Sequence, residues 1–288
     1  MSKPKQDIFD QKIVRLRRGR GQRIAGSTFL LDRCADDLCE RLLDINRSFE
    51  HTLIIGDKYF AKRVIRRLSG KIKSYAQLDD TTHNAQIIAA ATALPFKNNS
   101  FDLVINGLTL HSVNDIPKAM LEAKRVLKPD GLFVGALFGG ATLTELRHAF
   151  YKAEETIYGA ISPRIAPMID MSLAAKLLQK AGLTMPVVDK DNFTVNYKKL
   201  ETLFADLRRM GDTNALTARR RVPSTKSLFT ELEYVYKKEF SDNEKYRVRF
   251  EILWLTGWAS HSSQQKPLKP GSAKTRLSEV LGVKEYKL

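Results

Sequence analysis

The strongest constraint on the fold is a strand–helix–strand pattern in the middle of the chain. Residues 101–105 form a short, largely apolar segment, and residues 132–138 form a second, almost uninterrupted one. Between them, apolar residues recur at helical spacing from Ile116 to Leu127, and Pro117 lies in the first turn, where its missing N–H costs no hydrogen bond. Because strands without polar alternation are typical of sheets covered on both faces, the pattern predicts a βαβ unit with parallel strands.

The segments on either side of this unit extend the sheet. Residues 52–56 and 71–78 are expected to be strands, with a basic helix over residues 60–68 between them. Late in the chain, apolar and polar residues alternate over residues 193–197 and 246–254, as in antiparallel strands. The sequence therefore predicts an α/β fold whose sheet is mostly parallel, with a reversed last strand.

A single domain with additions at both ends accounts for the 288 residues. We expect a basic helical extension over residues 1–48 and the sheet core over residues 49–197. Residues 198–288 are expected to complete the same domain with helices between residues 198 and 242, the final strand and a tail. These inserted helices are expected to cover the edge of the sheet where ligands bind.

The net charge of +16, from 48 Lys and Arg against 32 Asp and Glu, predicts an acidic partner of some kind. Part of the excess lies in the first 23 residues, and residues 219–221 form a second basic cluster. A solvated basic helix is the simpler interpretation of the N-terminal segment, and an RNA-binding arm is the alternative. No zinc or ribonucleoprotein-type motif accompanies the charge, so nucleic acid is the weaker expectation for a partner.

Several other classes of protein are disfavoured by missing features. Cys34 and Cys39 cannot form a disulfide framework, which favours a reducing compartment. No apolar run approaches the roughly 18 residues of a membrane span, so no membrane segment is expected. The histidines have no His-x-Asp/Glu spacing, so no metal site is expected either.

Four short motifs resemble the second half of class I S-adenosylmethionine-dependent methyltransferases. They are Leu94-Pro95-Phe96, Ser100-Phe101-Asp102-Leu103-Val104, Leu108-Thr109-Leu110-His111 and Val126-Leu127-Lys128-Pro129-Asp130-Gly131. Each motif is weak alone, and their order over residues 94–138 carries the resemblance. It implies a Rossmann-like methyltransferase sheet, methyl transfer as the activity and S-adenosylmethionine as the cofactor.

A narrower resemblance spans nearly the whole chain. The sequence is similar to the NADH:ubiquinone oxidoreductase complex assembly factor 5 group at Leu110-His111-Ser112-Val113-Asn114-Asp115, residues 137–147, residues 162–167, Val195-Asn196-Tyr197, Met210-Gly211-Asp212-Thr213-Asn214 and Gly257-Trp258. That group is related to the methyltransferases that act on malonyl thioesters in biotin synthesis. The resemblance implies a complex I assembly factor whose partner is a protein substrate or complex subunit, with a small acidic substrate as an alternative.

The same resemblance leaves the activity open. One mitochondrial member of the group is associated with hydroxylation of an arginine in a complex I subunit, so arginine hydroxylation is an implied alternative to methyl transfer. A chaperone that has kept the fold and lost catalysis is another. The chain shows no presequence, which favours a bacterial relative and a location in the cytoplasm.

The first half departs from the methyltransferase pattern at the cofactor loop. In methyltransferases this loop reads Glu/Asp-x-Gly-x-Gly-x-Gly, and its glycines let the backbone approach the ligand. Here only Gly56 remains, Ile54 replaces the acid, and Lys58 and Phe60 stand where glycines are expected. Side chains at these positions would occupy space that the methionine part of the cofactor uses.

Matching the remaining positions to the resembled family gives a set of cofactor contacts. Asp79 matches the acid that binds the ribose hydroxyls, although Gln77 competes for the aligned position. Further on, Ala91-Thr92-Ala93 replaces the acidic residue usual before Leu-Pro-Phe. The expected cofactor-binding residues are Ile55, Gly56, Asp57, Asp79, Thr92, Ala93, Asn106 and Leu110.

Three candidate catalytic residues follow the ends of the two central strands, where open α/β sheets bind ligands. His111 is a candidate base, with a hydrogen-bonding interior histidine as the alternative. Glu145 and Arg147 follow the later strand, and Arg147 is a candidate to hold an acidic substrate group. Solvated helix charges are the alternative for both.

Overall fold

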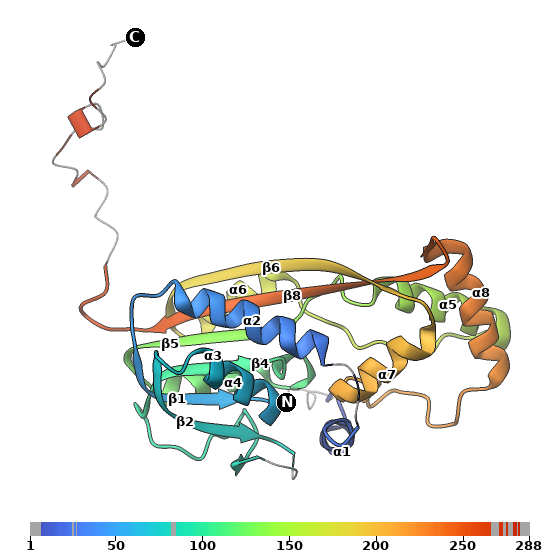
Figure 1. The fold of residues 1–288 in the computed structure, drawn as a ribbon, viewed down its shortest axis with the longest axis horizontal. Helices are drawn as coiled ribbons and strands as arrows, with labels where there is room; N and C mark the ends of the chain where they lie inside the picture. The colour runs from blue at the N-terminus through green and yellow to red at the C-terminus, as the bar shows by residue number, and fades with distance from the viewer. Residues whose placement is uncertain are drawn as a thin grey trace, which may run out of the picture.

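The computed structural model describes residues 7–24, 26, 28–81, 85–265, 271–272, 275, 279–280 and 282. Its strands are β1 (Phe49–Ile55), β2 (Ile72–Asp79), β3 (Ile87–Ile88), β4 (Phe101–Gly107), β5 (Leu127–Phe138), β6 (Leu183–Tyr197), β7 (Ser241–Asp242) and β8 (Lys245–Ala259). Its helices are α1 (Gln11–Gly21), α2 (Phe29–Leu43), α3 (Lys58–Arg67), α4 (Ile116–Val126), α5 (Thr144–Tyr158), α6 (Met171–Lys180), α7 (Leu200–Met210) and α8 (Lys226–Phe240), with a short 3₁₀ helix η1 (Leu110–Ser112). Figure 1 shows their arrangement around one twisted sheet.

The sheet confirms the predicted fold class. Its strand order is β3-β2-β1-β4-β5-β8-β6, with β7 pairing to β8 alone. Strands β4 and β5 are parallel, with Leu103 opposite Leu132 and Val104 opposite Phe133, as the βαβ pattern predicted. Strand β8 runs antiparallel to both β5 and β6, so it is the reversed last strand.

Helix α4 forms for the reasons visible in the sequence. The Asp115 side chain caps its start by accepting a hydrogen bond from the Lys118 N–H, and a proline lies in its first turn. Strand β5 follows at once and starts at Leu127, earlier than predicted, because Leu127 already pairs with Phe101. The register then shifts before Leu132 pairs with Leu103, and Asp130 in this stretch has a φ of +61°.

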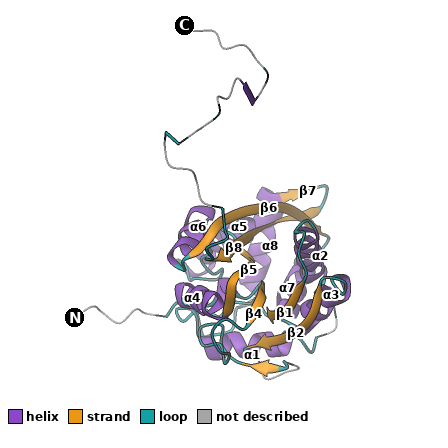
Figure 2. Ribbon diagram, turned by 90° about the vertical axis from the view of Figure 1, so that its left-hand side faces the viewer, coloured by secondary structure: helices purple, strands orange, loops and turns teal. Residues whose placement is uncertain are grey.

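Two hydrophobic cores lie on opposite faces of the sheet. Figure 2 shows helices on both sides of the strands. One face is covered by α2 and α3 and, farther along, by α5, α7 and α8. The other face is covered by α4 and α6. Because both faces are covered, the central strands carry apolar side chains on both sides, which explains their lack of alternation.

The N-terminal helix is not the solvated helix that the sequence predicted. Helix α1 lies against α7, and Arg18 on it is only 8% exposed. The two backbones touch at paired glycines: a Cβ on Gly21 would lie 2.6 Å from the Arg209 carbonyl oxygen. A Cβ on Gly211, whose φ is +78°, would lie 2.5 Å from the Cα of Arg18. The basic residues before Asp7, which were predicted to belong to the same basic extension, lie outside the described residues.

The helices inserted between β6 and β8 divide their roles. Helix α7 lies near the carboxyl ends of the central strands, as predicted for the inserted helices, whereas α8 packs against α5 (Figure 1). Within the described part of the chain, no helix combines the length and the apolar character needed to cross a membrane.

Candidate functional site

Two cavities lie at the carboxyl edge of the sheet, where the loops after β1, β4 and β5 meet. The smaller one has a volume of about 30 Å³ and the larger one about 230 Å³. Arg18 and Asp212 line both cavities, so their side chains form part of the wall between them. In an open α/β fold this edge is the expected place for a ligand.

The smaller cavity lies beside two of the residues predicted to contact the cofactor, Asp57 and Asp79. It is lined by Arg18, Gln22, Leu31, Asp57, Asp79, Gly107, Leu108, Thr109, Met210 and Asp212. A volume of about 30 Å³ has room for roughly two water molecules. Three of its lining residues come from α1, the turn after α1 and the segment just after α7, so elements outside the core sheet close it.

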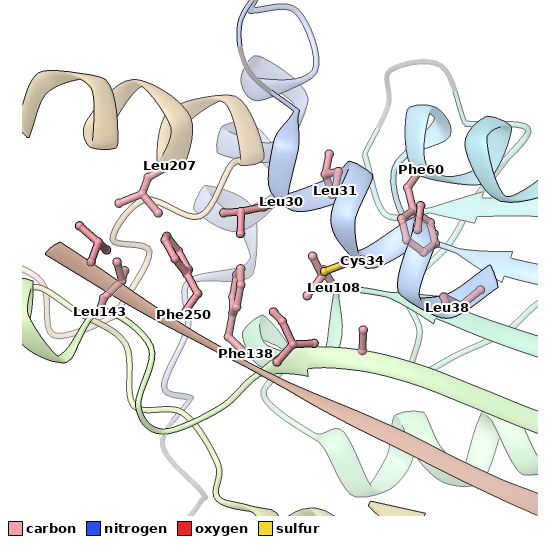
Figure 3. Packing of buried hydrophobic residues seen from close by; sticks show 14 of the residues in the cluster. Leu30, Leu31, Cys34, Leu38, Phe60, Leu108, Phe138, Leu143, Leu207 and Phe250 are labelled. Carbon is pink, nitrogen blue, oxygen red and sulfur yellow. The ribbon is translucent and has the colours of Figure 1, made fainter. Parts of the chain in front are cut away.

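Phe60 fills the space that a glycine-rich loop would leave open. Helix α3 begins at Lys58, directly after the Asp57 cap, whose carboxylate accepts from the Tyr59 N–H at 2.6 Å. The Phe60 ring lies so close to Gly107 that a Cβ there would be 2.4 Å from it. Figure 3 shows the ring projecting from α3 beside the buried residues of α2.

Asp79 lies at the end of β2, as predicted for the ribose-binding acid, but its carboxylate is already engaged. It is 4% exposed and accepts hydrogen bonds from the Gln22 side-chain amide at 2.8 Å and the Thr81 hydroxyl at 3.2 Å. Burial raises the pKa of Asp79 to about 6, against the lowering effect of Arg18. The residue just after α1 thus takes the hydrogen bonds that a ribose would use.

With α1 docked, these residues do not fit S-adenosylmethionine. The cofactor needs space for adenine, ribose and a methionine chain, and the cleft retains about 30 Å³. Phe60 and the α1 contacts occupy the remainder, so the closed cleft cannot hold a molecule of that size.

The larger cavity is mainly apolar. Its walls include aromatic side chains from β5, α5, α7, α8 and β8: Phe138, Phe150, Phe204, Phe229 and Phe250. Figure 3 shows Phe138 and Phe250 on neighbouring strands, with Leu207 of α7 and Leu143 beside them. The ring centroids of Phe138 and Phe250 are 6.2 Å apart. A cavity of this size and lining suits a side chain or another small ligand with a long apolar part.

His111 brings a polar group into this apolar cavity. Its Nε2 lies 2.9 Å from an Asp212 carboxylate oxygen, and its side chain is 6% exposed. Its Nδ1 is buried with no hydrogen-bond partner among the described residues. A neutral ring that donates its Nε2 proton to Asp212 leaves the Nδ1 lone pair free, so His111 and Asp212 have the arrangement of a base and the carboxylate that orients it.

The other two predicted catalytic residues lie elsewhere. The Glu145 carboxylate accepts a hydrogen bond from the backbone N–H of Arg249 at 3.2 Å and lies 3.7 Å from the Nε of the Arg249 side chain. Arg147 donates to the Ala166 carbonyl at 3.3 Å and lines a separate surface groove. The structure therefore brings His111 to the larger cavity but does not bring Glu145 or Arg147 there.

The predicted cofactor contacts are also divided. Asp57 and Asp79 line the smaller cavity, and Gly56 packs against Gly107 with a φ of +143°. The remaining predicted residues do not line the smaller cavity: Ile55 and Leu110 are buried apolar residues, Asn106 accepts from the Thr109 hydroxyl, and Thr92 and Ala93 lie in the loop before β4.

The second basic cluster makes internal contacts. Arg219 pairs with Asp10 at 3.2 Å, and the Arg220 guanidinium lies 4.0 Å from the centre of the Tyr158 ring. These contacts engage two of the three arginines, so less of the positive charge of this cluster is available to bind nucleic acid.

Asp212, Arg18 and Gln22 are site residues that the sequence patterns did not reveal. Asp212 lies 101 positions from His111, so no local spacing connects the pair. It did fall within the motif Met210-Gly211-Asp212-Thr213-Asn214, which carried part of the family resemblance. No group of three or more His, Cys, Asp or Glu that could hold a metal ion occurs in the described ranges.

The fold and its edge cavities define a methyltransferase-fold protein. A family model described as a methyltransferase domain matches residues 60–135. Among solved structures, YcgJ from Bacillus subtilis superposes with a TM-score of 0.53 at 15% identity, over 80% of this chain and 99% of that one. At this identity the likeness supports the fold alone.

The chain belongs to the family of the mitochondrial arginine-hydroxylase NDUFAF5. It is 33% identical to the Mus musculus protein, over 95% of this chain and 84% of that protein. The Dictyostelium discoideum protein is 41% identical over 66% of this chain, which spans only 44% of that relative. The malonyl-[acyl-carrier protein] O-methyltransferase of Xylella fastidiosa (strain M23) is 28% identical, over 81% of this chain and 78% of that enzyme.

Proposed function

We propose that the chain is an assembly factor for respiratory complex I that holds and acts on an arginine side chain of a subunit in the cavity of His111 and Asp212. Family membership supports arginine as the target, because the relatives are named arginine-hydroxylases. The observation that carries the proposal is the buried His111–Asp212 pair in an apolar cavity, where the His111 Nδ1 has no hydrogen-bond partner in the described part of the chain.

An arginine side chain matches this cavity chemically. A guanidinium has five N–H donors and no acceptor, and the free Nδ1 lone pair of His111 is an acceptor. The three methylenes of the side chain can pack on Phe138 and Phe250, and aromatic faces attract the cation. The Asp212 carboxylate adds a negative charge at the same wall.

Two side chains would take part in the chemistry. His111 can accept a proton at Nδ1, and Asp212 would fix the ring orientation and stabilise the imidazolium that forms. Hydroxylation replaces a C–H bond of the substrate arginine with C–O–H, a two-electron oxidation, so an oxygen-donating oxidant must enter as a separate co-reactant and take up those electrons. The contribution assigned to these residues is binding, orientation and movement of that proton.

The test compares His111→Gln with His148→Gln, a matched control at a histidine whose side chain is 49% exposed and pairs with Glu239. Each variant replaces the chain in a bacterium that contains complex I. Mass spectrometry then measures arginine modification in the subunits, and NADH oxidation measures assembled complex.

We expect His111→Gln to lower the modification about a hundredfold and His148→Gln to leave it unchanged. Full modification with His111→Gln would overturn the assigned role. Normal complex assembly without any modified arginine, in cells that contain the unmutated chain, would instead favour a chaperone without catalysis.

Methyl transfer from S-adenosylmethionine is the second candidate. It is favoured by the methyltransferase fold and by the position of Asp79 at the end of β2. Titration calorimetry of the full chain with S-adenosylmethionine and S-adenosylhomocysteine separates the two candidates. Saturable heat at millimolar ligand would favour methyl transfer, and its absence is expected while α1 fills the cleft.

We also propose the bacterial cytoplasm as the location of the protein. The buried free thiols of Cys34 and Cys39 are compatible with a reducing compartment. Fractionation of a bacterium that expresses the tagged full chain tests this, and recovery with the periplasmic fraction would contradict it.

A further inference from the structure

Arg18 lies in a set of groups that can accept its hydrogen bonds. Its Nη2 lies 2.8 Å from the Ser112 hydroxyl, 3.3 Å from the Thr109 carbonyl and 3.5 Å from the Leu108 carbonyl. Its Nη1 is 3.8 Å from an Asp80 carboxylate oxygen. A hydroxyl, two carbonyls and a carboxylate match a planar group that carries donors alone, which is a guanidinium.

The two carbonyls are held by the sheet rather than by Arg18. Leu108 directly follows β4 in the left-handed region, with φ of +53°, and its N–H donates to the Ala136 carbonyl of β5. The Thr109 hydroxyl donates to Asn106, and η1 then places Ser112. The carbonyls therefore keep their positions when the Arg18 side chain is absent.

The element that carries Arg18 is attached outside the two main cores. Around α1, the buried apolar residues Phe9 and Val14 pack with Ala215 and Leu216 in a small separate cluster. Helix α1 contributes no buried residue to either main core, so its displacement would leave the cores on both faces of the sheet closed. Segments attached outside a core unfold at lower free-energy cost than core elements.

The position of this acceptor set connects it to the proposed site. Arg18, Ser112, His111 and Asp212 line the same cavity of about 230 Å³. A second guanidinium entering beside Arg18 would meet a like charge in a place 8% exposed to solvent, where screening is weak. Exchange of one arginine for another is therefore favoured over addition.

We propose that Arg18 is the internal occupant of a guanidinium-binding site and that an arginine side chain of a polypeptide takes this site when α1 moves away. The site consists of the Leu108 and Thr109 carbonyls, the Ser112 hydroxyl and the Asp80 carboxylate. The inference rests on the proposed function, since it assumes that the target is an arginine. It adds the residues that recognise the guanidinium and a self-blocking contact that substrate must displace.

Calorimetric titration of the full chain with the peptide acetyl-Gly-Gly-Arg-Gly-Gly-amide tests the exchange. The variants are Arg18→Ala and Arg20→Ala, a matched control at an exposed arginine on the same helix. Peptides with lysine or citrulline in place of arginine test chemical selectivity.

We expect Arg18→Ala to bind the arginine peptide about tenfold more tightly than the unmutated chain or Arg20→Ala, because the competing occupant is gone. The lysine and citrulline peptides should bind Arg18→Ala at least about tenfold more weakly. Equal affinity of the unmutated chain and Arg18→Ala, or no preference for arginine over citrulline, would overturn the inference.

A second measurement applies if Arg18→Ala does not fold, as judged by circular dichroism. Hydrogen exchange of the unmutated chain is compared with and without saturating arginine peptide. Amides of residues 11–21 should lose protection while those of β4 keep theirs, and unchanged protection of residues 11–21 would contradict displacement. Failure here with a clear His111→Gln defect would remove the exchange mechanism and leave the proposed function intact.

Discussion

The two halves of the carboxyl edge differ sharply, although the same sheet supports both. Over β1, β2 and β4 the edge is closed, with about 30 Å³ left between α1 and the strand ends. Over β4, β5 and β8 it is open, with about 230 Å³ between aromatic walls. The fold provides a ligand edge along both halves, and the side chains decide which half can be occupied.

The closed half is also the half where the cofactor motif is degenerate. Phe60 replaces a glycine of the pattern and fills the space next to Gly107, while Gln22 bonds to Asp79. In the open half, one ring nitrogen of the His111–Asp212 pair has no hydrogen-bond partner within the residues that the structure describes. Loss of a cofactor loop therefore need not remove a neighbouring site that is built from other strands.

Replacing Phe60 with Ala should disrupt the packing of the closed half and cause the largest loss of unfolding free energy among these variants. Phe60 is fully buried, so the substitution removes its packing and leaves a cavity that should lower the free energy of unfolding by about 3 to 5 kcal/mol. Urea unfolding measures the change. Lys62→Ala, at an exposed position on the same helix, should stay within about 0.5 kcal/mol, and a similarly small loss for Phe60→Ala would show that this half is loosely packed.

Replacing Glu154 with Gln should loosen the open half. This carboxylate has no exposed surface and accepts hydrogen bonds from the Ser162 N–H and hydroxyl, each at 2.6 Å, and from Arg164 at 2.8 Å. Arg164 lines the larger cavity, so the contact holds one of its walls. We expect a loss of about 2 to 3 kcal/mol in urea unfolding.

The neighbouring Glu155→Gln is the control for this prediction, because Glu155 is exposed on the same helix. If both variants lost the same stability, helix α5 rather than the wall of the cavity would be responsible.

The pH dependence of stability should distinguish the closed half, because Asp79 lies in it with a raised pKa. Burial raises the pKa of Asp79 to about 6 from its ordinary value of 3.8, so the folded chain binds more protons than the unfolded chain between these values. Its contribution to stability is therefore fully present below about pH 4 and is lost as pH rises through about 6.

Asp79→Asn removes this titration, and the Gln22 amide can turn its oxygen toward the new NH₂ group. Relative to the unmutated chain, the variant should gain about 2 to 3 kcal/mol of unfolding free energy between pH 4 and pH 7. Thermal or urea unfolding across this range measures the difference, and parallel curves for the two proteins would contradict it.

The smallest effect is expected at a reference pair outside both halves. Glu50 and Lys73, on β1 and β2, are 2.6 Å apart, and their side chains are 56% and 63% exposed. Glu50→Ala should cost less than about 1 kcal/mol, and the cost should fall further at high salt because solvent and ions screen exposed charges. A larger loss of unfolding free energy would mean that exposed ion pairs, and not only buried groups, contribute to the difference in stability between the two halves.

Much of the fold could be predicted because its signals are local. Periodicity located α4 and the central strands, Pro117 marked the first turn of α4, and alternation identified β8 as an antiparallel strand. The packing of α1 against the rest of the molecule could not be predicted in the same way. A helix rich in arginine looks solvated until the acceptors that bury Arg18 are known, and they lie 90 to 94 positions away.

The sequence by itself determined the order of strands and helices, the reversed last strand, the loss of the glycine-rich loop and the position of His111 after β4. These depend on residues that are neighbours along the chain. Only the tertiary structure decided that Gln22 bonds to Asp79, that Arg18 closes one half of the edge and that Asp212 orients His111 in the other. The physical reason is that hydrogen bonds and excluded volume act between atoms a few ångströms apart, whatever their separation in sequence, and a spacing pattern carries no record of them.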